Sequence, residues 1–308
     1  MKPIVTLTLN PSVDGASETD RIRPTHKIRT SGARYDPGGG GINVARVICA
    51  LGGDALPVYF CGGPTGALLD ELLAACAFSA HPIRIDDLTR ISHAVYERET
   101  GLEYRFVPEG PTVSPAEWQS CLDALCALDF DYIVASGSRP AGMADDCYRD
   151  VAAVAAAKGA RLVVDTSGAT LAATLAGGGV HLAKPSLGEF RTLTSMPLET
   201  PEAVEAEARR RVTDGLCDML AITMGHEGAV LATRDTTLRL TPPDVPVRSA
   251  VGAGDSFLGA MTLALARGER PENAFRHGMA AGTAAVMTPG PELCNAADVA
   301  RIYAVMSG

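Results

Sequence analysis

The pattern of apolar and polar positions predicts a mixed α/β fold. Apolar runs typical of buried strands occur at residues 4–10, 56–63, 130–138, 160–168, 180–186 and 217–225. Helical segments lie between most of them, at 41–51, 64–77, 143–159, 186–194 and 201–215. Strands that alternate with helices form a mostly parallel sheet with helices on both faces. We therefore expect a three-layer α/β/α sandwich, completed by a terminal hairpin over 229–242 and apolar helices over 253–288 and 295–305.

Two segments depart from this alternation. Residues 16–35 are polar and poorly helical, and residues 91–107 alternate around a Thr-Gly turn, which is typical of a hairpin. We interpret the chain as one domain, 1–308, whose small β-sheet lid is formed by about 16–35 and 91–107. Alternating apolar side chains on an exposed face of the lid favour burial against another surface, so we expect a homodimer joined through the lids.

Composition narrows the class of protein. Apolar residues make up 46% and charged residues 20% of the 308, and the net charge is -9. Such a balance is ordinary for a globular protein and argues against nucleic acid or an anionic membrane as partner. The eight cysteines are scattered without C-x-x-C pairs, and each apolar run is too short to span a membrane. We expect a cytoplasmic protein with reduced cysteines.

Two glycine-rich stretches are candidates for chemistry. The first, D36-P-G-G-G-G-I-N-V-A-R46, has two interpretations: a tight strand–helix turn, or a ligand site at a helix N-terminus. The second, A-V-G-A-G-D-S-F-L-G-A at 250–260, places Asp255 where a turn becomes a helix. Asp255 is either a helix N-cap or a base that faces an anion hole of main-chain amides. The P-loop, dinucleotide, zinc-protease and nucleophile-elbow motifs are absent from the sequence.

Taken together, four stretches resemble a known family. G252-A-G-D255, G38-G-G-G-I-N43, S136-G-S138-R-P and V164-D165 match the ribokinase-like (PfkB) sugar-kinase family in order and spacing, over essentially the whole chain. The resemblance is closest to the 6-phosphofructokinase branch, through TLTLNPSVD at 6–14, PGGGGINVAR at 37–46, VGAGDSFLGAMTL at 251–263 and LC at 293–294.

The resemblance implies roles around the acceptor sugar. Asp255 would be the catalytic base, and Gly252, Ala253 and Gly254 would form the anion hole for the γ-phosphate. The sugar would contact Asp14, Gly38, Gly39, Asn43 and Ser138. A phosphate already on the sugar would be held by Lys27, Arg29, Arg90 and Arg105, with Arg29 reaching in from a partner subunit. Taken singly, each of these cations is more readily interpreted as a solvated surface charge, but together they match the phosphosugar branch, and a kinase of unphosphorylated sugars has no need of the cluster.

The resemblance also implies a nucleotide-binding site. ATP would contact Lys184, Ser186, Thr223, Gly225 and Gly228, and Glu189 would organise Mg²⁺ through water. The family motif there is Asn-x-x-Glu, whereas this chain has S186-L-G-E189, and the shorter serine side chain predicts altered binding of MgATP. Ser249, Val251, Ala285 and Gly290 occupy the places of the family's monovalent-cation (K⁺) site.

The implied reaction is transfer of the γ-phosphoryl group of MgATP to the 1-hydroxyl of fructose 6-phosphate, giving fructose 1,6-bisphosphate. Tagatose-6-phosphate kinase and 1-phosphofructokinase share these motifs and stay open as alternatives. A non-catalytic sugar-phosphate sensor is a hypothesis of another class; Ser186 favours it slightly, and the presence of Asp255 argues against it.

Overall fold

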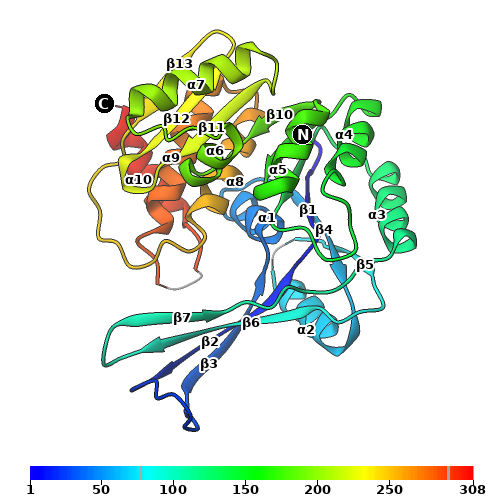
Figure 1. Cartoon of the computed structure of the whole chain (residues 1–308), viewed down its shortest axis with the longest axis vertical. Coiled ribbons are helices and arrows are strands. Elements are labelled where there is room, and N and C mark those ends of the chain that lie inside the picture. Colours follow the sequence, from blue (N-terminus) through cyan, green and yellow to red (C-terminus); the bar gives the residue numbers. More distant parts are fainter. Residues whose placement is uncertain (77, 290–291, 308) are drawn as a thin grey trace.

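The computed structural model describes residues 1–76, 78–289 and 292–307, and its core is one large sheet. The order of the nine strands is β13-β12-β11-β10-β9-β8-β1-β4-β5 (Figure 1). All neighbours pair in parallel except β12 and β13, which add antiparallel strands at one edge. The strands are β1 (Ile4–Thr8), β4 (Ala55–Cys61), β5 (His81–Arg84), β8 (Tyr132–Ser136), β9 (Arg161–Asp165), β10 (Val180–Ala183), β11 (Met219–Thr223), β12 (Ala229–Thr233) and β13 (Thr237–Leu240).

Helices cover both faces of this sheet. Successive strand residues face opposite sides, so Val5 and Leu7 pack in one apolar cluster and Ile4 in the other. The cluster of Ile4 includes residues of α1 (Gly40–Ala50), α8 (Ala253–Ala266) and α9 (Pro271–Ala285), and α10 (Ala296–Ser307) packs on α9. The cluster of Val5 includes residues of α3 (Pro115–Ala127), α4 (Tyr148–Ala157), α5 (Gly168–Gly177), α6 (Leu187–Thr194) and α7 (Pro201–Thr213). The predicted α/β/α sandwich is confirmed.

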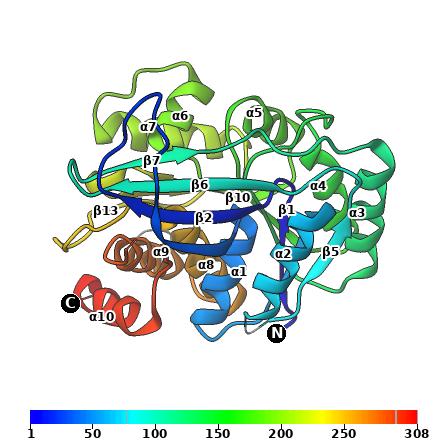
Figure 2. The ribbon, with the colours of Figure 1, turned by 90° about the horizontal axis from the view of Figure 1, so that it is seen from below.

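A second, smaller sheet projects from the body, as predicted (Figures 1 and 2). Its order is β3-β2-β6-β7, from β2 (Ser12–Thr19), β3 (Ser31–Gly38), β6 (Arg90–Glu97) and β7 (Leu102–Phe106). The parallel pairing of β2 with β6 joins the two distant segments. Its first hairpin spans 12–38 rather than 16–35, because Ser12 already pairs with Gly38 and Arg90 at the base. Helix α2 (Gly63–Ala74) lies beside that base and packs on Val13 and Ile42.

Some elements differ from the sequence-based expectation. The sequence indicates a surface helix around Trp118 without fixing its ends; the structure begins this helix, α3, at Pro115, where Ser114 and Glu117 form a capping box. Strand β5 is a four-residue edge strand containing Pro82, which gives too short an alternation to detect. Helix α4 begins at Tyr148 rather than near 143. Among the described residues, no helix combines the length and apolar character needed to cross a bilayer.

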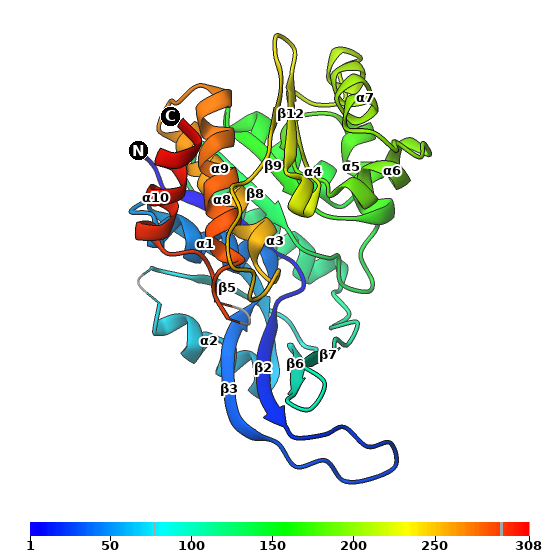
Figure 3. The ribbon, with the colours of Figure 1, turned by 90° about the vertical axis from the view of Figure 1, so that its left-hand side faces the viewer.

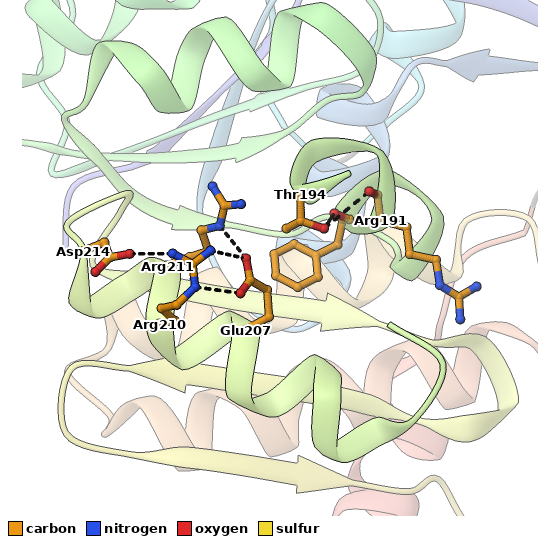
Figure 4. Close-up of polar contacts among 7 residues, drawn as sticks. Arg191, Thr194, Glu207, Arg210, Arg211 and Asp214 are labelled. Carbon is orange, nitrogen blue, oxygen red and sulfur yellow. Dashed lines mark hydrogen bonds and ion pairs between the residues drawn. The ribbon is translucent and has the colours of Figure 1, made fainter. Parts of the chain in front are cut away.

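A buried carboxylate on α7 is held by two arginines of the same helix (Figure 4). Glu207 is 5% exposed and accepts hydrogen bonds from Nε and Nη2 of Arg210 at 2.8 and 2.7 Å. Nε of Arg211 donates to the same carboxylate at 2.7 Å, and Nη1 of Arg210 also binds Asp214 at 2.9 Å. The bonds from Arg210 lower the pKa of Glu207 below its ordinary value of 4.5. Charge-assisted bonds to a buried group are stronger than exposed ion pairs.

We expect Glu207→Gln to lower the free energy of unfolding by about 1–3 kcal/mol, because two guanidinium groups lose their charged acceptor. The folded-state pKa of Glu207 is depressed, so its stabilisation is complete above 4.5 and is lost as the pH falls through the folded value. The deficit of the variant, measured by urea unfolding, should therefore shrink in acid. Asp214→Asn is the matched control, because Asp214 is 57% exposed. Equal losses in the two variants would contradict the assignment.

Candidate active site

The topology of the central sheet creates a crevice beside β1. Strands β1 and β8 are neighbours, but the next strand of the sheet after β1 is β4 on one side and the next after β8 is β9 on the other, so the connections after β1 and β8 run in opposite directions. Ligands of open α/β sheets bind at such a switch point. Helix α1 begins there: a Cβ on Gly40 would overlap the Ser136 hydroxyl at the end of β8. A helix N-terminus and the ends of two strands therefore meet at one place.

The glycine run is required by this crowding. Gly39 has φ 120°, and a Cβ there would lie 2.6 Å from Cγ2 of Thr8. A Cβ on Gly38 would overlap the carboxylate of Asp14. Consecutive glycines are expected where the backbone has a positive φ or approaches another group closely, and both conditions are present here. The turn packs tightly and also brings the start of α1 against Asp14.

Asp255 lies in the first turn of α8 and is not its N-cap. Gly252 occupies the N-cap position with φ 75°, and Asp255 is the third residue of the helix. Its Oδ2 accepts a hydrogen bond of 2.9 Å from Nδ2 of Asn43 on α1. The N-cap interpretation of Asp255 is therefore wrong. Burial, together with the charge of Asp165, raises the pKa of Asp255 to about 6.

A buried ion pair lies beside the same turn. Nζ of Lys184, after β10, is 3.1 Å from Oδ2 of Asp165 at the end of β9. A Cβ on Gly254 would lie 3.2 Å from that ammonium, so Lys184 flanks the start of α8. Burial raises the pKa of Asp165. Burial alone would lower the pKa of Lys184, but the facing Asp165 outweighs it and raises the pKa. A positive charge, paired with Asp165, is thus held next to the first turn of α8.

Asp255, Asn43 and Gly252 open on a cavity of about 380 Å³, which Lys184 and Asp165 do not line. The expected site residues that line it are Asp14, Gly39, Asn43, Arg90, Arg105, Val251, Gly252 and Asp255. Oδ1 of Asp14 accepts a bond of 2.5 Å from Ser12 and another from Ser92. Ser12, Ser92 and Arg46 also line the cavity and were missed. The position of Ser12, two residues before Asp14 on one strand, was the available signal, since such residues share a face.

The four expected phosphate-binding cations divide into two pairs. Nη1 and Nη2 of Arg90 donate to the main-chain oxygens of Pro108 and Asn10 at 3.0 and 2.9 Å. Its Nε is buried and has no partner within the described residues. Arg105 lines both this cavity and an adjoining outer one of about 640 Å³. Lys27 and Arg29 instead lie exposed in the connection between β2 and β3, which extends away from the body (Figure 3).

The remaining sugar-side residues lie close to the cavity. Gly38 ends β3 against Asp14, as described above. Ser138 follows β8, and its hydroxyl is 3.2 Å from Nδ2 of Asn10. Ala253 begins α8 between Gly252 and Gly254.

The expected nucleotide residues gather at the carboxyl ends of β10 and β11, next to Lys184. Thr223 ends β11 and forms a bridge with Ser186. Gly225 and Gly228 bound the turn that follows, both with positive φ. Ser186 is the N-cap of α6, and Oε2 of Glu189 accepts bonds from its amide and hydroxyl at 2.7 and 2.8 Å. These residues border the Asp255 turn but do not line its cavity.

The described residues form no direct metal cage. Within them, no three His, Cys, Asp or Glu side chains converge as metal ligands. Mg²⁺ that accompanies ATP keeps several waters and takes phosphate oxygens, so it needs only one or two carboxylates. Glu189 and Asp165 lie within electrostatic reach of each other at this edge and fit that requirement.

The expected K⁺ ligands lie around the end of α9. The amides of Arg248 and Ser249 both donate to the oxygen of Val286, which places the segment leading to Val251 beside that helix end. The carbonyl of Ala285 already accepts from the amide of Thr288 at 3.1 Å. Gly290 lies outside the described residues.

A carboxylate of raised pKa beside a helix N-terminus and a buried lysine defines a phosphotransferase-like site. Such a site can accept a proton from a hydroxyl while amides and an ammonium stabilise a transferring anion. The sequence profile of the pfkB family carbohydrate kinases matches residues 7–298, and the chain belongs to that family. The resemblance expected from the motifs is confirmed, and the protein is an ATP-dependent sugar kinase.

Individual relatives are similar over the whole chain. The ATP-dependent 6-phosphofructokinase isozyme 2 of Mycobacterium tuberculosis is 40% identical over 97% of this chain and 88% of its own. The Escherichia coli protein of that name is 37% identical over 100% of both chains. The crystal structure of phosphofructokinase-2 from E. coli in complex with potassium covers 100% of both chains with a TM-score of 0.96. A 1-phosphofructokinase of Xanthomonas campestris is 33% identical over 85% of this chain and 83% of its own.

We expect Gly39→Ala to destabilise the protein by about 2–4 kcal/mol, since strain at positive φ adds to the overlap with Thr8. Gly159→Ala is the matched control, because Gly159 has φ 66° and nothing within 4 Å of an added Cβ. The control should lose about 1–2 kcal/mol, the cost of the backbone conformation alone. Urea unfolding measures both, and equal losses would show that the close approach is unimportant.

Proposed function

We propose that the protein transfers the γ-phosphoryl group of MgATP to the 1-hydroxyl of fructose 6-phosphate. The observation that carries this proposal is a single cavity lined by Asp255, Asp14 and two arginines, Arg90 and Arg105. The kinase relatives of highest identity named above are 6-phosphofructokinases, and one E. coli phosphofructokinase-2 structure contains fructose 6-phosphate.

Asp255 is the base in this proposal. Its carboxylate takes the proton of the attacking hydroxyl, and its raised pKa makes it a better acceptor than an exposed aspartate. The amide of Asn43 holds the carboxylate by donating to Oδ2, which leaves Oδ1 for the hydroxyl. The amides of Gly252, Ala253 and Gly254, with Lys184 beside them, stabilise the transferring phosphoryl group. Asp14, bound by Ser12 and Ser92, accepts hydrogen bonds from sugar hydroxyls.

Arg90 and Arg105 hold the phosphate that the sugar already carries. Guanidinium groups bind phosphate through paired hydrogen bonds, and the buried Nε of Arg90 is a free donor among the described residues. The cavity offers no feature that separates fructose 6-phosphate from tagatose 6-phosphate, which differ in one hydroxyl. Because one relative is a 1-phosphofructokinase, fructose 1-phosphate is a second candidate for the acceptor sugar. A non-catalytic sensor fits less well, since a sensor has no use for a buried base of raised pKa.

ATP occupies the edge formed by Thr223, Gly225 and Gly228 in this proposal. Mg²⁺, which neutralises phosphate charge when bound, is organised through water by Glu189, whose Oε2 already caps α6. Carbonyls of Ser249, Val251, Ala285 and Gly290 are the proposed K⁺ ligands. The potassium complex of E. coli phosphofructokinase-2 supports a monovalent cation in this family.

The small sheet acts as a lid and as a dimer surface in this proposal. One face of it exposes the large apolar side chains of Tyr35, Ile91, Leu102, Tyr104 and Phe106. Such a patch favours burial against a second copy. Lys27 and Arg29, at the far end of the lid, would then serve the partner's cavity. A tetrameric inhibited form is known for E. coli phosphofructokinase-2, so a dimer need not be the largest assembly. The eight free cysteines suit a reducing compartment such as the cytoplasm.

We expect Asp255→Asn to lower kcat by about 10²–10⁴-fold, because an amide cannot accept the proton. In the wild type, kcat/KM should fall about tenfold per pH unit below about 6, as the base becomes protonated. Asp165→Asn removes a negative charge that raises this pKa, so the acidic limb should move to lower pH. An Asp255→Asn enzyme of normal activity, or a limb that does not move, would refute the assignment.

We expect Ser186→Asn to strengthen Mg²⁺ activation several-fold, because the longer amide reaches towards ATP and the Glu189 carboxylate is freed from its bond with the Ser186 hydroxyl. Asparagine is an equally good N-cap, so thermal stability should change little. Ser114→Asn is the matched control: Ser114 and Glu117 form the same capping box on α3, away from the site. Mg²⁺ titration of the ATP-dependent rate measures the effect. An unchanged Mg²⁺ affinity, or an equal change in the control, would rule the idea out.

A further inference from the structure

Asn10 joins three segments of the chain at the switch point of the sheet. It lies between β1 and β2, where the chain leaves the body for the lid, and it is 3% exposed. Its side-chain Nδ2 donates to the main-chain oxygen of Glu109 at 2.8 Å and to the hydroxyl of Ser138 at 3.2 Å. Glu109 lies just after β7, where the chain returns from the lid. One amide therefore ties the outgoing chain to the returning chain and to the loop after β8.

Arg90 is oriented by the same two lid connections. Nη2 of Arg90 donates to the main-chain oxygen of Asn10, and Nη1 donates to that of Pro108, the neighbour of Glu109. The two carbonyls must keep a fixed separation for the planar guanidinium to reach both. The bond from the Asn10 side chain to Glu109 fixes that separation. Arg90 is left with a buried Nε that has no acceptor in the described part of the chain.

The packing around Asn10 leaves little room for another arrangement. Gly110 has φ 101°, and a Cβ there would overlap Oδ1 of Asn10. That Oδ1 is itself buried and without a donor among the described residues. The orientation of the amide is thus set by the main-chain oxygen of Glu109, which can only accept and so requires an N–H donor, and by close packing.

We propose that Asn10 is a positioning residue that sets the affinity for the phosphorylated sugar by orienting Arg90. Arg90 lines the cavity and Asn10 does not, so Asn10 acts through the arginine. The inference rests on the proposed function, in which Arg90 binds the phosphate of the sugar. Phosphate binding then depends on the arginine itself and also on the fixed connection between lid and body.

A double-mutant cycle tests the inference on the full chain. Asn10→Ala should raise the KM for fructose 6-phosphate about tenfold, with little change in kcat or in the KM for MgATP, because substrate binding alone is affected. In an Arg90→Ala background, Asn10→Ala should add less than about twofold, since both changes remove one interaction. Asn10→Asp keeps the shape but lacks both N–H donors, so it should behave as Asn10→Ala does.

Asn273→Ala is the control for the two Asn10 variants. Asn273→Ala removes an amide that binds Arg276 on α9, away from the cavity, and should leave both KM values unchanged. Effects of Asn10 and Arg90 that multiply, or a parallel rise in the KM for MgATP, would overturn the inference and leave the proposed function intact. Failure of both Asn10 variants to fold, measured by thermal unfolding, would assign Asn10 a structural role instead. A wild type that phosphorylates no phosphorylated ketohexose would overturn the proposed function and the Asn10 role together.

Discussion

The hydrogen bond between Asn43 and Asp255 is the constraint on which the site depends. It joins the first turn of α1 to the first turn of α8, residues that are 212 positions apart in the chain. Two helix N-termini therefore converge on one cavity, which Gly39, Gly40 and Gly252 line. The bond also fixes a carboxylate whose ionised form is disfavoured by burial, which is the reason for its raised pKa. One contact therefore joins Asp255 and the start of α8 to the helix that follows the glycine turn.

The charged side chains around Asp255 are placed by the same convergence of strands and helices. Lys184 is balanced by Asp165, so the site holds a cation without an excess of positive charge when it is empty. The arginines of the lid carry the charge that a phosphorylated substrate needs, and Asn10 fixes one of them to the body. In the proposed function, these cations at the cavity separate a phosphosugar kinase from a kinase of neutral sugars.

Much of the fold was predictable, because parallel strands that are buried on both faces read as continuous apolar runs. The partition of Val5 and Ile4 to opposite faces follows from strand geometry alone. The two lid segments were predicted as strands, but their extent was underestimated because Ser12 and Asp14 are polar residues that bind one another inside the cavity. The short strand β5 carries too few residues for a pattern.

The site was predictable where a motif fixes a backbone shape, as at Gly39 and Gly252, both of which have positive φ. The N-cap interpretation of Asp255 failed because sequence spacing cannot show a contact as distant as Asn43. Asn10 and Asp165 were missed as contributors for the same reason: their partners, Glu109 and Lys184, are defined only by the folded chain. Lys27 and Arg29 do not line the cavity of their own chain, so their role in phosphate binding stays a prediction.

The most direct test of the account is a coupled ADP-release assay with four acceptors: fructose 6-phosphate, tagatose 6-phosphate, fructose 1-phosphate and free fructose. The account predicts that fructose 6-phosphate has the highest kcat/KM. Free fructose should be poorer by about a hundredfold or more, since each charge-assisted hydrogen bond to the phosphate contributes about 1.5–3 kcal/mol. Turnover of free fructose as efficient as that of the phosphorylated sugars, or no turnover of any of the four with Mg²⁺ and K⁺ present, would contradict it.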